Sequence, residues 1–145
     1  MKMLDVVNPA TEELITQLPI DDGAAVALKA QNARNAQATW AATPLSERMA
    51  CIQRFRALVQ RQLDDLAKIM TQETGKPLGH SRNELNGFLG RVDFFLAEAE
   101  GILKTETVYN QDGMCEQIQH IPLGLIGNIS AWNYPWFVGG NVFVP

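Results

Sequence analysis

The residues with the clearest chemical potential form a short turn near the end of the sequence, Trp132-Asn133-Tyr134-Pro135. Asn133 carries a neutral side-chain amide that can donate hydrogen bonds, and Pro135 restricts the adjoining backbone. An amide donor held in a fixed orientation can stabilise an oxyanion that develops during a reaction. The turn therefore offers one component of an active site, and a complete site needs further groups.

The residues on both sides of the turn predict that it lies between a strand and a helix. Gly124 to Ser130 is short and almost entirely apolar, as expected for a central parallel strand. Pro135 suits the first position of a helix. Ligands of α/β proteins bind at the carboxyl ends of such strands. Turn statistics alone favour a structural role instead, in which the Asn133 amide satisfies local backbone groups.

Three long helices upstream must position the turn, at about residues 21–40, 43–75 and 78–103. Asp21 or Asp22 can cap the first helix. Thr43 can cap the second, with Pro44 at its first helical position. Gly75 is the expected end of the second helix, because a left-handed residue there is most easily a glycine.

The second of these helices has the most regular apolar face. Its members recur at helical spacing, and Arg56 is the one charged residue among them. The series is Leu45, Met49, Ile52, Arg56, Val59, Leu63, Leu66 and Met70. Long helices with short connections predict a helical layer packed on another element, and a free-standing bundle is the alternative.

Two β-hairpins are predicted, one before the helices and one after them. The first spans residues 6–19 around the turn signal Asn8-Pro9. The second spans residues 107–121 around Asp112-Gly113, a dipeptide typical of tight hairpin turns. Pro122 ends its second strand, because proline cannot donate to a ladder hydrogen bond.

Composition excludes several classes of protein. The 145 residues suit one domain, and the net charge of −4 argues against a nucleic-acid partner. The sequence has no signal peptide and no apolar run of about 18 residues, so we expect no membrane span. Cys51 and Cys115 lack metal-binding or CxxC spacing, so we expect no metal site and a cytoplasmic location.

Four groups of residues, in the same order along the chain, resemble the aldehyde dehydrogenase superfamily. They are Asn8-Pro9-Ala10-Thr11, then Trp40 with Arg48, then Glu73-Thr74-Gly75-Lys76-Pro77-Leu78, and finally Ile129 to Pro135 after Pro122-Leu123-Gly124. The resemblance covers residues 4–145, which is well under half of a family member. It implies an α/β parent with a Rossmann-type cofactor domain, of which this segment is a helix-rich part with a few strands.

The resemblance also implies a domain assignment. Residues 1–145 would be the N-terminal part of the cofactor-binding domain, ending after the first Rossmann strand and its turn. Residues from about 105 to 122 would form part of the oligomerisation hairpin. We therefore expect a homo-oligomer.

The family oxidises aldehydes to acids with NAD or NADP, through a thiohemiacetal on a cysteine and a glutamate that activates water. By resemblance, Asn133 matches the asparagine whose side-chain amide helps hold the oxyanion. Ile129, Ser130, Ala131 and Trp132 match the strand end and turn that line the cofactor site. The resemblance names neither the aldehyde nor the choice between NAD and NADP.

The catalytic cysteine, the glutamate base and the residues that grip the cofactor ribose lie further downstream in the family. Neither Cys51 nor Cys115 matches the catalytic cysteine, so we expect the chain by itself to be inactive. In some members the segment containing Glu73 contributes to a monovalent-cation site, and the resemblance does not decide whether this chain has one.

Two other hypotheses compete with the enzyme interpretation. The first is a catalytically silent helical module that self-associates through its helix stripes and strand edges. The second is an unrelated Rossmann protein, which is disfavoured because no GxGxxG sequence follows the predicted strand. Gly75-Lys76-Pro77 is not a phosphate-binding P-loop either, because it lacks the spaced glycines and the following Ser or Thr, and it is interpreted as a helix stop.

Overall fold

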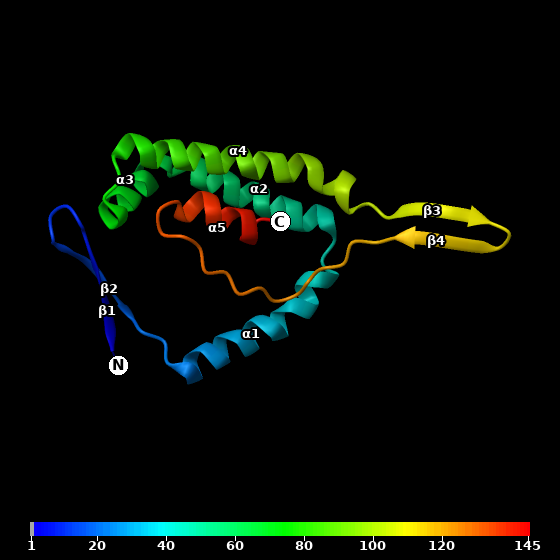
Figure 1. Ribbon diagram of the computed structural model, residues 1–145, viewed down its shortest axis with the longest axis horizontal. Helices are drawn as coiled ribbons and strands as arrows, with labels where there is room; N and C mark the ends of the chain where they lie inside the picture. The colour runs from blue at the N-terminus through cyan, green and yellow to red at the C-terminus, as the bar shows by residue number, and fades with distance from the viewer. Residues whose placement is uncertain (1) are drawn as a thin grey trace.

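A computed structural model describes residues 2–145 and shows a cluster of helices from which one hairpin and one further helix extend, with a second hairpin joined to the N-terminal end of that helix (Figure 1). The helices are α1 (Gly23–Ala42), α2 (Leu45–Arg61), α3 (Leu63–Thr74), α4 (Leu78–Leu103) and α5 (Pro135–Phe143). The strands are β1 (Met3–Val7), β2 (Leu14–Pro19), β3 (Glu106–Gln111) and β4 (Met114–Ile118). β1 pairs with β2 and β3 pairs with β4, each time antiparallel.

The hydrophobic core lies where α2, α3 and α5 pack against α4. Phe88 of α4 is fully buried at its centre. Its ring centroid lies 5.5 Å from that of Trp136 in α5 and 6.0 Å from that of Phe55 in α2. The buried apolar residues are Val59, Ala67, Met70, Leu85, Phe88, Leu89, Val92 and Val144.

A glycine allows α5 to lie close to α4. A Cβ atom at Gly140 would lie 2.3 Å from Cε2 of Phe88, well inside van der Waals contact. The backbone of α5 therefore touches the Phe88 ring directly, an approach that only a residue without a side chain permits. This contact places the start of α5, and the turn before it, against α4.

The second predicted helix is wrong in one respect, because the structure divides it into α2 and α3 at Gln62. The Gln62 N–H donates to the carbonyls of Leu58 and Val59, at 3.1 and 3.2 Å, and its φ of −104° and ψ of 13° leave the helical range. The apolar series continues across this break with unchanged spacing, so the pattern could not reveal it. After the break α3 takes a different direction (Figure 1).

The first position of α2 also differs from the prediction. Pro44 is the N-cap of α2 and contributes no side-chain hydrogen bond, whereas Thr43 is the C-cap of α1. The Thr43 hydroxyl donates to the carbonyl of Thr39, so it serves the end of α1 and not the start of α2. The predicted end of the second helix is confirmed, because Gly75 is the left-handed C-cap of α3 with φ of 74°.

Most other predicted elements are confirmed. Asp22 caps α1 by accepting a hydrogen bond from the Ala25 N–H at 2.9 Å, and α4 has the predicted bounds of residues 78–103. Both hairpins form, and Asp112 and Gly113 adopt positive φ of 54° and 76° in the second turn. β4 ends at Ile118, earlier than predicted.

The predicted parallel strand from Gly124 to Ser130 is wrong for this structure. The segment is irregular and runs past α1 between β4 and α5 (Figure 1). Ile129 is 100% exposed. A strand forms only when a neighbouring strand satisfies its backbone groups, and no described strand lies beside this segment. Its apolar composition therefore marks a surface that the described residues leave uncovered.

Among residues 2–145, no helix combines the length and apolar character needed to cross a membrane. The same residues contain no group of three or more His, Cys, Asp or Glu side chains arranged to hold a metal ion. Cys51 is half-buried in α2 and Cys115 is exposed in β4, and both are free thiols.

Candidate active site

The turn that contains Asn133 leads directly into α5. Pro135 is the first residue of this helix, as the sequence predicted. The N-cap residue, Tyr134, contributes no side-chain hydrogen bond to the first turn. The first N–H groups of any helix lack intrahelical acceptors, so α5 must find acceptors elsewhere.

Glu84 of α4 provides the missing acceptor. Its Oε1 atom accepts hydrogen bonds from the N–H groups of Trp136 at 2.9 Å and Phe137 at 3.2 Å. The Glu84 side chain is fully buried. A carboxylate at this position is also favoured by the positive end of the helix dipole. The N-terminus of α5 is therefore capped from a different helix.

Lys76 completes the arrangement. Its Nζ atom lies 2.5 Å from Oε2 of Glu84 and donates a second hydrogen bond to the backbone carbonyl of Asn133 at 2.6 Å. It also lies 4.5 Å from the centroid of the Tyr134 ring, where a cation is attracted to the aromatic face. Both oxygens of the buried carboxylate have partners, which offsets the large unfavourable free energy of burying a charge.

The backbone around Gly75 places Lys76 within hydrogen-bonding distance of the turn. Gly75 ends α3 in the left-handed conformation, and Pro77 is the N-cap of α4. A Cβ atom at Gly75 would lie 2.9 Å from Cγ of Pro9, so the first hairpin also approaches here. The segment that the sequence presented as a helix stop thus also directs the Lys76 ammonium to Asn133.

The side-chain amide of Asn133 is exposed, and no hydrogen bond to it is present among the described residues. Its backbone is held while its amide is free to donate. A depression of about 320 Å³ adjoins it. The depression is lined by Thr74, Gly75, Lys76, His80, Trp132, Asn133 and Tyr134. Neither free cysteine is among these residues, so the described residues place a donor here without a thiol nucleophile.

The predicted cofactor-lining residues lie along the segment that enters the turn. Trp132 shares the depression with Asn133 and is 84% exposed. Ile129 and Ala131 are exposed, and Ser130 is half-buried, with its hydroxyl donating to Asn128 Oδ1 at 3.0 Å. Trp132 therefore lines the same depression as Asn133. The cofactor role of residues 129–132 stays a prediction.

The sequence did not lead us to Glu84, and it indicated only a helix stop for the segment that contains Lys76. A signal for Glu84 was available, because it lies one turn before Phe88 and two turns before Val92, in line with the buried stripe of α4. A carboxylate on a buried stripe needs a partner. No comparable local signal pointed from Lys76 to a turn 57 residues later.

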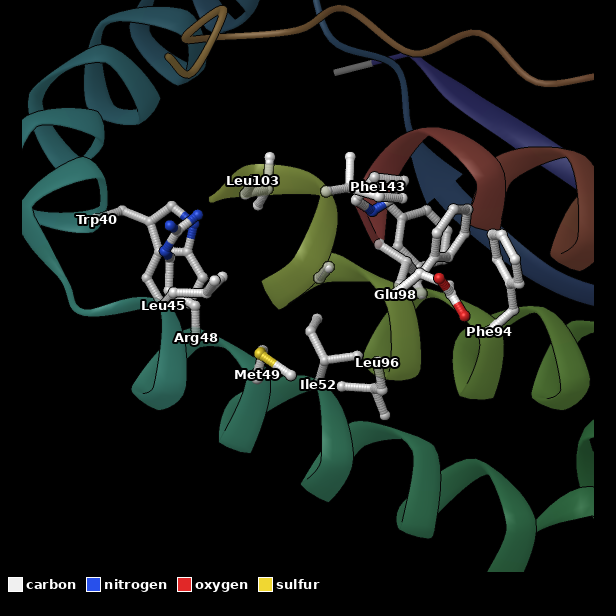
Figure 2. Close-up of a pocket in the computed structure, with 15 residues that line it drawn as sticks. Trp40, Leu45, Arg48, Met49, Ile52, Phe94, Leu96, Glu98, Leu103 and Phe143 are labelled. Carbon is white, nitrogen blue, oxygen red and sulfur yellow. The ribbon is translucent and has the colours of Figure 1, made fainter. Parts of the chain in front are cut away.

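A separate apolar groove of about 330 Å³ lies between α2, α4 and the end of α5 (Figure 2). Trp40 and Arg48, two positions that carry the family resemblance, line this groove and not the depression at Asn133. Arg48 Nε donates to the carbonyl of Thr43 at 3.3 Å. Arg48 therefore holds the connection between α1 and α2, and both residues line a groove other than the depression at Asn133.

Comparison with known proteins gives the family. The profile described as "Aldehyde dehydrogenase family" matches residues 1–145. The chain belongs to the aldehyde dehydrogenase family. The resemblance seen in the sequence is thereby confirmed.

Two relatives are semialdehyde dehydrogenases of bacteria. Malonate-semialdehyde dehydrogenase 1 of Shouchella clausii is 31% identical over 135 residues, which cover 92% of this chain and 27% of the relative. A succinate-semialdehyde dehydrogenase of Deinococcus radiodurans, named as using NADP(+), is 28% identical over 131 residues, covering 90% of this chain and 27% of the relative. The chain thus spans about a quarter of the length of these relatives.

Solved structures confirm the fold class. An aldehyde dehydrogenase from Brucella melitensis biovar abortus superposes with a TM-score of 0.92 at 27% identity, covering 99% of this chain and 30% of that one. A succinate-semialdehyde dehydrogenase from Burkholderia pseudomallei gives a TM-score of 0.88 at 28% identity, covering 97% and 29%. The chain therefore has the fold of the corresponding part of these enzymes, helix-rich with few strands.

Proposed function

We propose that the chain is the N-terminal part of an NAD- or NADP-dependent aldehyde dehydrogenase that oxidises an aldehyde to a carboxylic acid through a cysteine thiohemiacetal. The observation that carries this proposal is the Asn133 turn, whose backbone is held by Lys76 while its side-chain amide stays exposed beside a depression. The family match and the names of the semialdehyde dehydrogenase relatives support it.

In this proposal the Asn133 amide donates a hydrogen bond to the oxyanion that forms when a thiolate attacks the aldehyde carbonyl. The donor is pre-oriented, so little reorganisation is needed as the charge develops. A nicotinamide bound beside residues 129–132 would supply the hydride acceptor for this oxidation. No residue of this chain matches the thiolate or the base that activates water, and we propose that the chain by itself does not turn over aldehyde.

The residues present fit one wall of a cofactor site. Ile129 and Trp132 offer exposed apolar surface beside the turn. The first N–H groups of α5 are a natural site for phosphate. Here, however, Trp136 and Phe137 already donate to the Glu84 carboxylate. We therefore place the pyrophosphate away from α5 and assign 129–132 to contacts with an apolar part of the cofactor.

We further propose that the enzyme is a cytoplasmic homo-oligomer. The hairpin β3–β4 extends away from the helices, with free edges on both sides (Figure 1). Val108, Met114 and Ile118 are exposed on it. A free edge with apolar side chains favours pairing with another chain. The same hairpin favours the competing function, a silent self-assembly module, which predicts an oligomer with no dehydrogenase activity.

The substitution Asn133→Ala tests the proposed function in the enzyme that carries this segment. Loss of one oxyanion donor is expected to lower kcat by about 10²- to 10³-fold. The same factor should appear in kcat/KM, because the contact forms only along the reaction path. Steady-state NAD(P)H absorbance and the melting temperature are measured on the same preparation.

Asn32→Ala, at an exposed position of α1, is the matched control and should leave kcat unchanged. A structural role for Asn133 predicts another result. The variant would then lose about 1 kcal/mol of unfolding free energy and melt at a lower temperature. Its kcat in the folded fraction would be unchanged. That outcome would return Asn133 to an ordinary turn residue.

A further inference from the structure

We propose that Lys76 and Glu84 are positioning residues for the Asn133 amide, an inference that rests on the proposed oxyanion role of Asn133. The pair holds the backbone on the carboxyl side of Asn133 and so sets the direction of its side chain. Neither residue needs to touch the substrate. Together they connect the end of α3, the first turns of α4 and the start of α5.

The contact with the Asn133 carbonyl carries the inference. Lys76 Nζ donates to this oxygen at 2.6 Å, which fixes the peptide plane that follows the Cα atom of Asn133. A fixed peptide plane restricts ψ of that residue and therefore the direction of its Cβ. A lysine that served only to neutralise Glu84 would need no bond to the turn.

Glu84 holds the backbone at the start of α5, just after Asn133. Its Oε1 atom holds the N–H groups of Trp136 and Phe137, so α5 begins at a set place and angle relative to α4. Glu84 is fully buried and Lys76 is 14% exposed, so the bonds to the Glu84 carboxylate lie largely away from water. The bonds are stronger in such surroundings than they would be in water.

On the amino side of the turn, Ser130 lies beside Gly139 of α5, and the described residues supply no hydrogen bond to residues 129–132 from another element. Ile129 and Trp132 are largely exposed, and the segment through them is irregular. Among the described residues, the hydrogen bonds from other elements that hold the turn therefore come from Lys76 and Glu84, on its carboxyl side. Displacement of a catalytic donor by about 1 Å can lower a rate by about 10²-fold.

The test uses the enzyme that carries this segment. Lys76→Met keeps the length of the side chain and removes its charge and donors. We expect kcat to fall by about 10- to 10²-fold, with the KM for the cofactor nearly unchanged. Lys76→Arg retains a charged donor and should recover part of the loss. Lys68→Met, which removes an exposed lysine of α3 paired with Asp65, is the control and should leave kcat unchanged.

A double variant separates positioning from stability. If Lys76 acts through the Asn133 amide, Lys76→Met should cause no further loss of kcat in the Asn133→Ala background. Losses that multiply in the double variant would overturn the inference and leave the function of Asn133 intact. An unchanged kcat in Lys76→Met with a lower melting temperature would overturn it as well. If Asn133→Ala itself retains full kcat, the proposed function fails first, and the inference fails with it.

Hydrogen exchange tests the geometry without reference to activity. In the unsubstituted protein, the backbone amides of Trp136 and Phe137 should be protected from hydrogen exchange, although they lie in the first turn of α5. Glu84→Ala should raise their exchange rates by about tenfold or more, whereas Glu84→Gln, which retains an acceptor oxygen, should raise them less. If Lys76→Met does not fold, Lys76→Gln replaces it in the kinetic tests described above. Unprotected amides in the parent sequence would overturn the inference.

Discussion

The helical cluster α2–α5 and the segment from β3 to residue 131 use apolar residues in opposite ways. Phe88 in the cluster is 0% exposed, whereas Ile129 in the segment is 100% exposed. Both residues lie in stretches whose composition predicts burial. The cluster finds its partners among neighbouring helices, and the segment finds none among the described residues. Apolar composition therefore indicates where a partner is required, and the partner decides whether burial occurs.

The Asn133 turn lies at the boundary between these two regions. Its carboxyl side is held by Glu84 and Lys76 within the packed cluster, and its amino side continues into the exposed segment. A donor placed at such a boundary is ordered by one region and accessible through the other. Among the described residues, the Asn133 side chain is thus exposed next to a backbone that Lys76 holds.

The largest expected contrast is between truncating a side chain in each region. Phe88→Ala should lower the free energy of unfolding by about 3 to 5 kcal/mol, because it removes the ring at the centre of the aromatic contacts and leaves a cavity. Ile129→Ala should change it by less than about 0.5 kcal/mol. Urea titrations of both variants measure the difference. Equal losses would mean that the segment is packed in solution.

Glycine substitutions in the cluster sharpen the comparison, because two sites should respond with opposite signs. Gly140→Ala places a Cβ atom 2.3 Å from Phe88 Cε2, so overpacking should destabilise the fold by about 1 to 3 kcal/mol. Gly90→Ala meets nothing within 4 Å on the exposed face of α4 and should stabilise it by up to about 1 kcal/mol. Thermal melts of the two variants give the signs. A stabilising Gly140→Ala would contradict the close contact of α5 with α4.

A small effect is also expected from the ion pair between α2 and α4. Arg56 donates to both carboxylate oxygens of Asp93 at 2.8 and 2.9 Å, and this contact lowers the pKa of Asp93. A lowered folded-state pKa means that the pair stabilises the fold above the ordinary aspartate pKa of about 4. Its contribution is lost as the pH falls through the folded-state pKa.

Asp93→Asn should therefore lower stability at pH 7 by less than about 1 kcal/mol, since the pair is largely exposed. The difference from the parent chain should shrink as the pH is lowered below about 4. Urea titrations at several pH values measure it. Asp65→Asn, which removes a pair within the single helix α3, is the comparison and should show a smaller difference at pH 7. A difference that grows toward acid pH would contradict this assignment.

Short-range signals in the sequence determined most of the elements. Asp22 caps α1, Gly75 ends α3 and Asp112-Gly113 turns the second hairpin, each as predicted. These features depend on residues within a few positions of one another, so their types and spacing suffice. Arg56 shows the limit of that reasoning. It is the charged residue in an apolar series, and its partner Asp93 lies 37 residues away in the sequence.

Only the tertiary structure decided the break at Gln62, the missing strand at 124–130 and the support of Asn133. The bonds from Lys76 to the Asn133 carbonyl and from Trp136 to Glu84 join residues 57 and 52 positions apart. No local periodicity contains such pairs. They form because the approach of α5 to α4, through Gly140 and Phe88, brings a buried carboxylate to unsatisfied N–H groups, and each buried polar group must find a partner.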